Sequence, residues 1–85
     1  MNVLIPSPLL SYTGTNRVEA AGRTMADVLT DLDRQFPGLR FRVIDELDRM
    51  RPHMRFFVNG KQVHDIAIPL EPDDSIQIVQ ALSGG

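Results

Sequence analysis

The fold is decided by residues 55–63, which read Arg55-Phe56-Phe57-Val58-Asn59-Gly60-Lys61-Gln62-Val63. Aromatic and β-branched side chains favour strands, and Asn-Gly between two such runs is the strongest short-range signal for a two-residue hairpin turn. The segment therefore predicts a β-hairpin. A last strand is predicted at residues 76–81, where the alternation directs Ile76 and Ile78 toward a core.

Two extended segments begin the chain. Residues 3–12 are largely apolar but contain Pro6 and Pro8, which predicts an edge-type first strand with an irregular stretch in it. A turn signal at residues 13–16 is followed by renewed extended sequence at residues 17–20. Together these segments predict an N-terminal hairpin.

A helix is predicted between Thr24 and the pair Pro37-Gly38. Thr24 can accept a hydrogen bond from the amide of Asp27 as the N-cap, and the negative charge of Asp27 suits the first turn. Pro37 disfavours a helical backbone at Phe36, and Gly38 accepts a left-handed one. The apolar positions at helical spacing are Val28, Leu29, Leu32 and Phe36.

The segments on either side of the hairpin give weaker signals. Residues 39–54 contain apolar residues at helical spacing, which favours a short second helix; these residues are Val43, Ile44, Leu47 and Met50. Residues 66–72 read as a loop or a short strand, followed by a Pro-Asp-Asp turn.

The resulting order is strand, strand, helix, variable segment and three strands, which is the β-grasp or ubiquitin-like arrangement. We therefore expect an α+β fold with a mixed sheet of four to five strands and one main helix packed across it. The expected organisation is a single domain at residues 1–81 and a flexible tail at residues 82–85.

Composition excludes several classes of function. The 85 residues are 42% hydrophobic, which suits one small core and leaves no room for a two-lobed active-site cleft. The net charge of −2 with interleaved signs argues against a nucleic-acid partner. The chain has no cysteine, no signal-like N-terminus and no run of membrane-spanning length, so we expect a cytoplasmic protein without a membrane partner.

The C-terminal pair Gly84-Gly85, placed directly after a predicted strand, is the sharpest functional signal. Two terminal glycines bury nothing and raise the entropy cost of ordering the tail, so they serve a packed structure poorly. They suit a thin tail whose carboxylate must enter the active site of an enzyme. The alternative is an unstructured end with no function.

Three motifs stand out in the last third of the chain, which are Phe57-Val58-Asn59-Gly60, the turn at Asp73-Asp74 and the final Ala81-Leu82-Ser83-Gly84-Gly85. Together they resemble the C-terminal half of the ThiS/MoaD family of sulfur carriers. The helix start at residues 24–29 and the phrase at residues 36–39 are also similar to this family, particularly to carriers for cysteine synthesis, so the resemblance covers nearly the whole chain. Asp74 departs from the family pattern, which usually has glycine there, and Ser83 replaces another small residue.

The resemblance implies that the Gly85 carboxylate is the reactive site. A separate ATP-dependent adenylyltransferase would recognise Leu82, Ser83 and Gly84 and convert Gly85 into an acyl adenylate. A sulfur donor would then supply the sulfur of a thiocarboxylate, which a downstream synthase accepts. This chain would be a co-substrate rather than an enzyme, would bind no cofactor, and would leave the use of ATP to its partner.

A docking surface is predicted beside the tail. On the last strand Gln77, Val79 and Ala81 should point away from the core. Strict alternation would also turn Phe56 or Phe57 outward, and we predict that Phe57 belongs to the docking surface. The alternative is that the variable segment covers both aromatic rings.

Other candidate sites are weaker. His53, His64 and the pair Asp73-Asp74 lack the spacing and number of ligands of a metal site, so we predict no metal site. The arginines of the middle segment could contact an acidic groove, but a solvated face balanced by nearby acids is the preferred interpretation; they are Arg40, Arg42, Arg49, Arg51 and Arg55.

Two other functions stay open from the sequence. The chain could be a protein modifier joined through Gly85 to lysines of target proteins. It could also be a binding module that never reacts.

Overall fold

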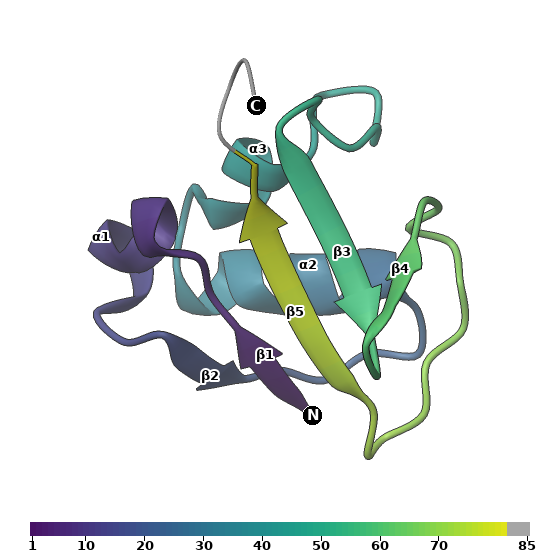
Figure 1. Ribbon diagram of the computed structural model, residues 1–85. Coiled ribbons are helices and arrows are strands. Elements are labelled where there is room, and N and C mark those ends of the chain that lie inside the picture. The colour runs from purple at the N-terminus through teal and green to yellow at the C-terminus, as the bar shows by residue number, and fades with distance from the viewer. Residues whose placement is uncertain (82–85) are drawn as a thin grey trace.

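The predicted hairpin and last strand are two parts of one five-stranded sheet, seen in the computed structural model, which describes residues 1–81 (Figure 1). The elements in chain order are β1 (Asn2–Leu4), a 3-10 helix (Ser7–Leu9), α1 (Leu10–Thr13), β2 (Arg17–Glu19), α2 (Met25–Gln35), α3 (Leu39–Val43), β3 (Met54–Val58), β4 (Lys61–Val63) and β5 (Ser75–Gln80).

The order of strands across the sheet is β2-β1-β5-β3-β4. β1 and β5 run parallel, whereas β1 with β2, β3 with β4 and β3 with β5 are antiparallel. The sheet is therefore mixed, and α2 crosses one of its faces (Figure 1). The β-grasp fold predicted from the order of elements is confirmed, and β5 is its central strand.

The core fills the space between α2 and the sheet. Phe56 is its largest fully buried side chain, and Ile76 and Ile78 are buried as predicted. The other core residues are Val3, Ile5, Leu9, Val18, Ala20, Met25, Val28, Leu29, Leu32, Leu39, Val43, Ile44, Met54 and Leu70. Among the helices that residues 1–81 form, none combines the length and the apolar character that a membrane crossing requires.

The start of α2 has its backbone donors satisfied by two different segments. The predicted N-cap is confirmed, because the Asp27 amide donates to Thr24 Oγ1 at 3.2 Å. The amides of Met25 and Ala26 donate to carbonyls of the 66–72 segment, which is a loop rather than a strand. This loop therefore satisfies helix-end groups that water would otherwise solvate.

The first predicted strand is too long and misplaced. β1 ends at Leu4, and the chain turns after Pro6 into the 3-10 helix and α1. Proline fixes φ at a value that suits the first turn of a helix. Because the prolines follow the strand instead of lying within it, β1 pairs on both sides, with β2 and β5, and is not an edge strand.

The short second helix is confirmed as α3, but it ends at Val43, before the predicted apolar repeat does. Ile44 instead forms an isolated bridge with Met50. Between them the Asp45 carboxylate accepts hydrogen bonds from the amides of Leu47 and Arg49, which closes a loop. Leu47 is consequently 64% exposed at this loop.

The β3–β4 turn is tied to the start of β5. Asn59 (φ 51°) and Gly60 (φ 84°) both have left-handed backbones, as a type I′ hairpin turn requires. Asn59 Nδ2 donates to Asp74 Oδ1 at 2.9 Å, and Asn59 Oδ1 accepts from the Ser75 amide at 2.9 Å. Asp74 Oδ2 also accepts from the Glu71 amide at 2.8 Å. The Asp74 side chain, at a position where the resemblance leads one to expect glycine, thus joins the β3–β4 turn to the turn before β5.

The Asp74→Ala variant should destabilise the fold at neutral pH, and this effect should shrink in acid. The Glu71 amide, and then the Asn59 side chain, hold the pKa of Asp74 below its ordinary value. A carboxylate with a lowered folded pKa stabilises the protein above its unfolded pKa of about 3.9 and loses that effect as the pH falls through the folded pKa.

Urea titrations of the wild type and Asp74→Ala at several pH values between about 7 and about 2.5 test this prediction. Asp73→Ala is the matched control, because within residues 1–81 its side chain makes no hydrogen bond. A difference in unfolding free energy between wild type and Asp74→Ala that stays constant with pH contradicts the proposed role.

Candidate functional site

The route to the C-terminus starts in the middle of the sheet. β5 is hydrogen-bonded to β1 on one side and to β3 on the other, and its last residues pair with the start of β3 (Met54 with Gln80). One further bond follows the strand, because the Ala81 amide donates to the His53 carbonyl at 2.7 Å. The chain is therefore held by β1 at residues 75–77 and by β3 and His53 as far as Ala81, which is the last described residue.

The predicted reactive residue and tail lie beyond this point. Gly85, and the recognition residues Leu82, Ser83 and Gly84, are outside the described residues, as is the predicted boundary of the tail. Their roles stay predictions from the sequence.

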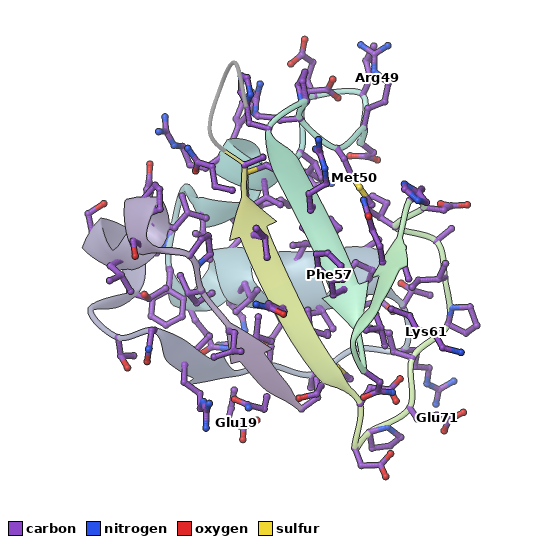
Figure 2. The ribbon with its side chains drawn as sticks, in the orientation of Figure 1. Glu19, Arg49, Met50, Phe57, Lys61 and Glu71 are labelled. Carbon is purple, nitrogen blue, oxygen red and sulfur yellow. The ribbon has the colours of Figure 1, made fainter. Side chains whose placement is uncertain are left out.

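The predicted docking residues of the strands share one face of the sheet. Phe57 on β3 is the register partner of Gln77 on β5, two residues before Val79. Figure 2 shows Phe57 over β3 on the face turned away from α2. Its neighbour Phe56 is fully buried in the core. Phe57 and Val79 are half-buried and Gln77 is exposed. Alternation along β3 therefore places one phenylalanine in the core and leaves the other accessible.

Two further residues on this face escaped the sequence reasoning. Leu4 on β1 is the parallel partner of Gln77, and Arg55 on β3 is the partner of Val79. Leu4 is half-buried, as Phe57 and Val79 are. These three residues form a partly apolar strip that crosses the central strand. The pairing of β1 with β5 joins opposite ends of the chain, so no local pattern signals it.

Charge is unevenly arranged at the carboxyl end of β5. Arg40 pairs with Asp48 (2.6 Å), and Arg49 pairs with Asp45 (3.2 Å). The Arg49 amide, and then other nearby donors including the Leu47 amide, lower the pKa of Asp45, so this carboxylate stays charged. These pairs match the predicted balanced face. Within residues 1–81, however, no acidic side chain forms an ion pair with the remaining arginines of the segment, which are Arg42, Arg51 and Arg55.

The described residues contain no assembled catalytic constellation. Every buried side chain between residues 1 and 81 is apolar, and no group of three His, Cys, Asp or Glu side chains gathers there. His53 and His64 are both exposed. The arrangement instead holds the end of β5 by hydrogen bonds to β3, with a partly apolar sheet face and a group of arginines beside it.

Comparison with known proteins gives a family. The model of the ThiS family matches residues 3–85. The sulfur carrier protein CysO of Mycobacterium tuberculosis is 30% identical over 100% of this chain and 98% of its own length. The crystal structure of that protein has a TM-score of 0.90 at 28% identity, covering 95% of this chain and 98% of its own.

Two further relatives are informative. The crystal structure of the Amycolatopsis orientalis BexX/CysO complex contains a chain with a TM-score of 0.90 and 26% identity, covering 99% of this chain and 98% of its own. The small archaeal modifier protein 3 of Haloferax volcanii is 29% identical over 73% of this chain and 70% of its own length.

Proposed function

The chain belongs to the ThiS family, and on this premise we propose that it carries sulfur as a thiocarboxylate formed at the carboxyl group of Gly85. The observation that supports this most is the position of Gly84-Gly85, which follows an anchored central strand by only a few residues. The chain is then a co-substrate, and the chemistry is performed by the enzymes that bind it.

Two steps convert the carboxylate. An oxygen of the Gly85 carboxylate attacks the α-phosphorus of ATP, and pyrophosphate leaves, which produces an acyl adenylate. Sulfur at the oxidation level of hydrosulfide then attacks the carbonyl carbon, and the bond to the AMP oxygen breaks. The products are the thiocarboxylate, AMP and a proton, so no oxidant or reductant is needed. Adenylation is required because a free carboxylate has no good leaving group.

The anchoring of β5 supports this role physically. The four residues after Ala81 can span at most about 14 Å when extended, so the enzyme must approach closely to this end of the sheet. β1 pairs with the first half of β5, while β3 and the His53 carbonyl hold its last residues, and these hydrogen bonds resist fraying while an enzyme holds the terminus. The strip formed by Leu4, Phe57 and Val79 offers that enzyme a partly apolar contact surface.

The proposed partners are therefore an ATP-dependent adenylyltransferase, a sulfur donor and a downstream synthase that accepts the sulfur. The solved complex of a CysO protein with BexX supports a carrier of this shape binding another protein. ATP is bound by the adenylyltransferase in this scheme, and this chain needs no cofactor of its own. A reaction that consumes ATP fits a cytoplasmic location.

Attachment to proteins is the second candidate function, and the similarity to a small archaeal modifier protein favours testing it. Both functions begin with the same adenylate and differ in the nucleophile, which is sulfur in one case and a lysine amine in the other. Conjugates of high mass that survive reductant and depend on Gly85 would support the modifier.

Pyrophosphate exchange tests the shared first step. The full chain should stimulate exchange of labelled pyrophosphate into ATP by the adenylyltransferase of the same organism. If that enzyme activates another carrier but shows no exchange with this chain, the chain is not adenylated and a non-reactive binding module becomes the better account.

A further inference from the structure

A depression of about 430 Å³ lies beside the carboxyl end of β5. Its lining residues are Phe41, Arg42, Arg51, His53, Met54 and Gln80, and we call it the cationic cradle. We propose that the cationic cradle receives an acidic side chain of the enzyme that acts on Gly85. This inference rests on the proposed function, since it names how that enzyme is recognised.

The charge of the cradle is uncompensated within the described chain. The neighbouring arginines Arg40 and Arg49 are neutralised by Asp48 and Asp45. Arg42 and Arg51 have no such acidic partner among residues 1–81. Two positive charges therefore remain on the same depression, in a molecule whose net charge is −2.

Arg51 is held in place before any partner arrives. Its Nε donates to the Phe41 carbonyl at 2.7 Å, and its guanidinium carbon lies 5.2 Å from the centre of the Phe41 ring. The Arg51 amide also donates to the Val43 carbonyl at 3.0 Å, which fixes the backbone. These contacts use only one of the five guanidinium N–H donors. A carboxylate can therefore bind the remaining donors at a low cost in side-chain conformational entropy.

The cradle is adjacent to the proposed reactive end. The backbone carbonyl of His53, a residue that lines the cradle, accepts the hydrogen bond from the Ala81 amide, and Gln80 belongs to both the cradle and β5. Only Leu82, Ser83, Gly84 and Gly85 follow in the sequence. An enzyme whose active site reaches Gly85 must therefore cover or border the cradle.

An acidic protein surface fits the cradle better than a nucleotide does. Phosphate chains are usually held by successive backbone N–H groups in a glycine-rich loop or nest, whereas no glycine of residues 1–81 lines this depression. Phe41 and Met54 also give it apolar walls, which suit the methylene groups of an aspartate or glutamate. Because the rest of the molecule is acidic, an acidic partner surface is attracted to this end and repelled elsewhere, which orients the encounter.

Charge reversal tests the proposal. Arg42→Glu alters an exposed side chain without any hydrogen bond among residues 1–81, so the variant should fold normally. Its Kd for the adenylyltransferase, measured by calorimetry without ATP, and its KM in pyrophosphate exchange should both rise about tenfold or more, with kcat little changed. Arg51→Glu should act in the same direction, and far-ultraviolet circular dichroism and thermal unfolding check that it folds.

Arg23→Glu is the matched control, since it makes the same charge change near Met1 and Pro72, away from the cradle. Its Kd and KM should stay within about twofold of the wild type. The dependence of Kd on salt should also be weaker for Arg42→Glu than for the wild type.

The outcomes separate this proposal from the proposed function. If the wild type is adenylated but Arg42→Glu behaves like Arg23→Glu, the cradle is not part of the interface and the proposal is wrong. If the isolated chain binds ATP and Arg42→Glu abolishes that binding, the cradle is a nucleotide site instead.

If deletion of Gly84-Gly85 lowers the thermal midpoint of the wild type but not of Arg42→Glu, the cradle holds this chain's own terminus. If the wild type is not adenylated but Arg42→Glu weakens binding to the enzyme, the proposed function is wrong and the assignment of the cradle to the interface is supported.

Discussion

Deletion of Gly85 should reduce thiocarboxylate formation to the background rate, while the thermal unfolding midpoint stays unchanged. The truncated chain ends in the carboxylate of Gly84, which lies one residue, or about 3.5 Å, short of the reactive position. A misplacement of that size removes the alignment that an enzyme provides between a carboxylate and the α-phosphorus of ATP. The described core ends at Ile78, so stability should not depend on Gly85.

Two control variants separate the position of the terminal carboxylate from other effects of changing the chain. Adding one alanine after Gly85 retains all native residues but moves the carboxylate outward, and this variant should also fail. Asp73→Ala lies at the opposite end of β5 from the tail and retains the length and all the tail residues, so it should be converted at a rate close to that of the wild type. Conversion of the truncated chain at the wild-type rate would show that Gly85 is not the reactive residue.

The second large effect is expected at Phe56. Replacing this fully buried ring with alanine should lower the free energy of unfolding by about 3–5 kcal/mol, because the apolar contacts are lost and a cavity remains. For a domain of this size the midpoint should fall by about 12 °C or more. The neighbouring Phe57→Ala variant should lose about 1 kcal/mol or less, because Phe57 lies on the outer face of the sheet.

The two variants should separate stability from function. Phe57→Ala should fold normally but bind the adenylyltransferase more weakly, as expected for an accessible aromatic side chain at an interface. Urea titration measures the stability of each variant, and calorimetry measures the binding of Phe57→Ala. Equal losses of stability for the two variants would contradict the assignment of opposite faces.

Most of the fold could be predicted because its signals are local. The turn at Asn59-Gly60, the cap at Thr24 and the end of α2 near Pro37 each depend on a few adjacent residues. The errors arose where distant residues decide the structure. The prolines of the first segment gave no indication that β1 would end at Leu4 and pair with β5, whose paired residues lie 73 positions later in the chain.

The candidate site also contains residues that local patterns predict and residues that only long-range pairing brings together. Alternation along the strands was enough to find Phe57, Gln77 and Val79 on one face, but Leu4 arrives there only through the long-range pairing of β1. The arginine cluster could be seen in the sequence, yet its ion pairs depend on how the loop between α3 and β3 folds. Arg40 and Arg49 match the predicted balanced face, whereas Arg42 and Arg51 line the cationic cradle.

The intact mass of the protein tests the central claim most directly. The full chain is incubated with ATP, its adenylyltransferase and a sulfide source, in parallel with the chain that lacks Gly85. The proposed function predicts a mass gain that corresponds to the exchange of one oxygen atom for sulfur, in the full chain only. An unchanged mass, with an enzyme and a donor that convert another carrier under the same conditions, would contradict it.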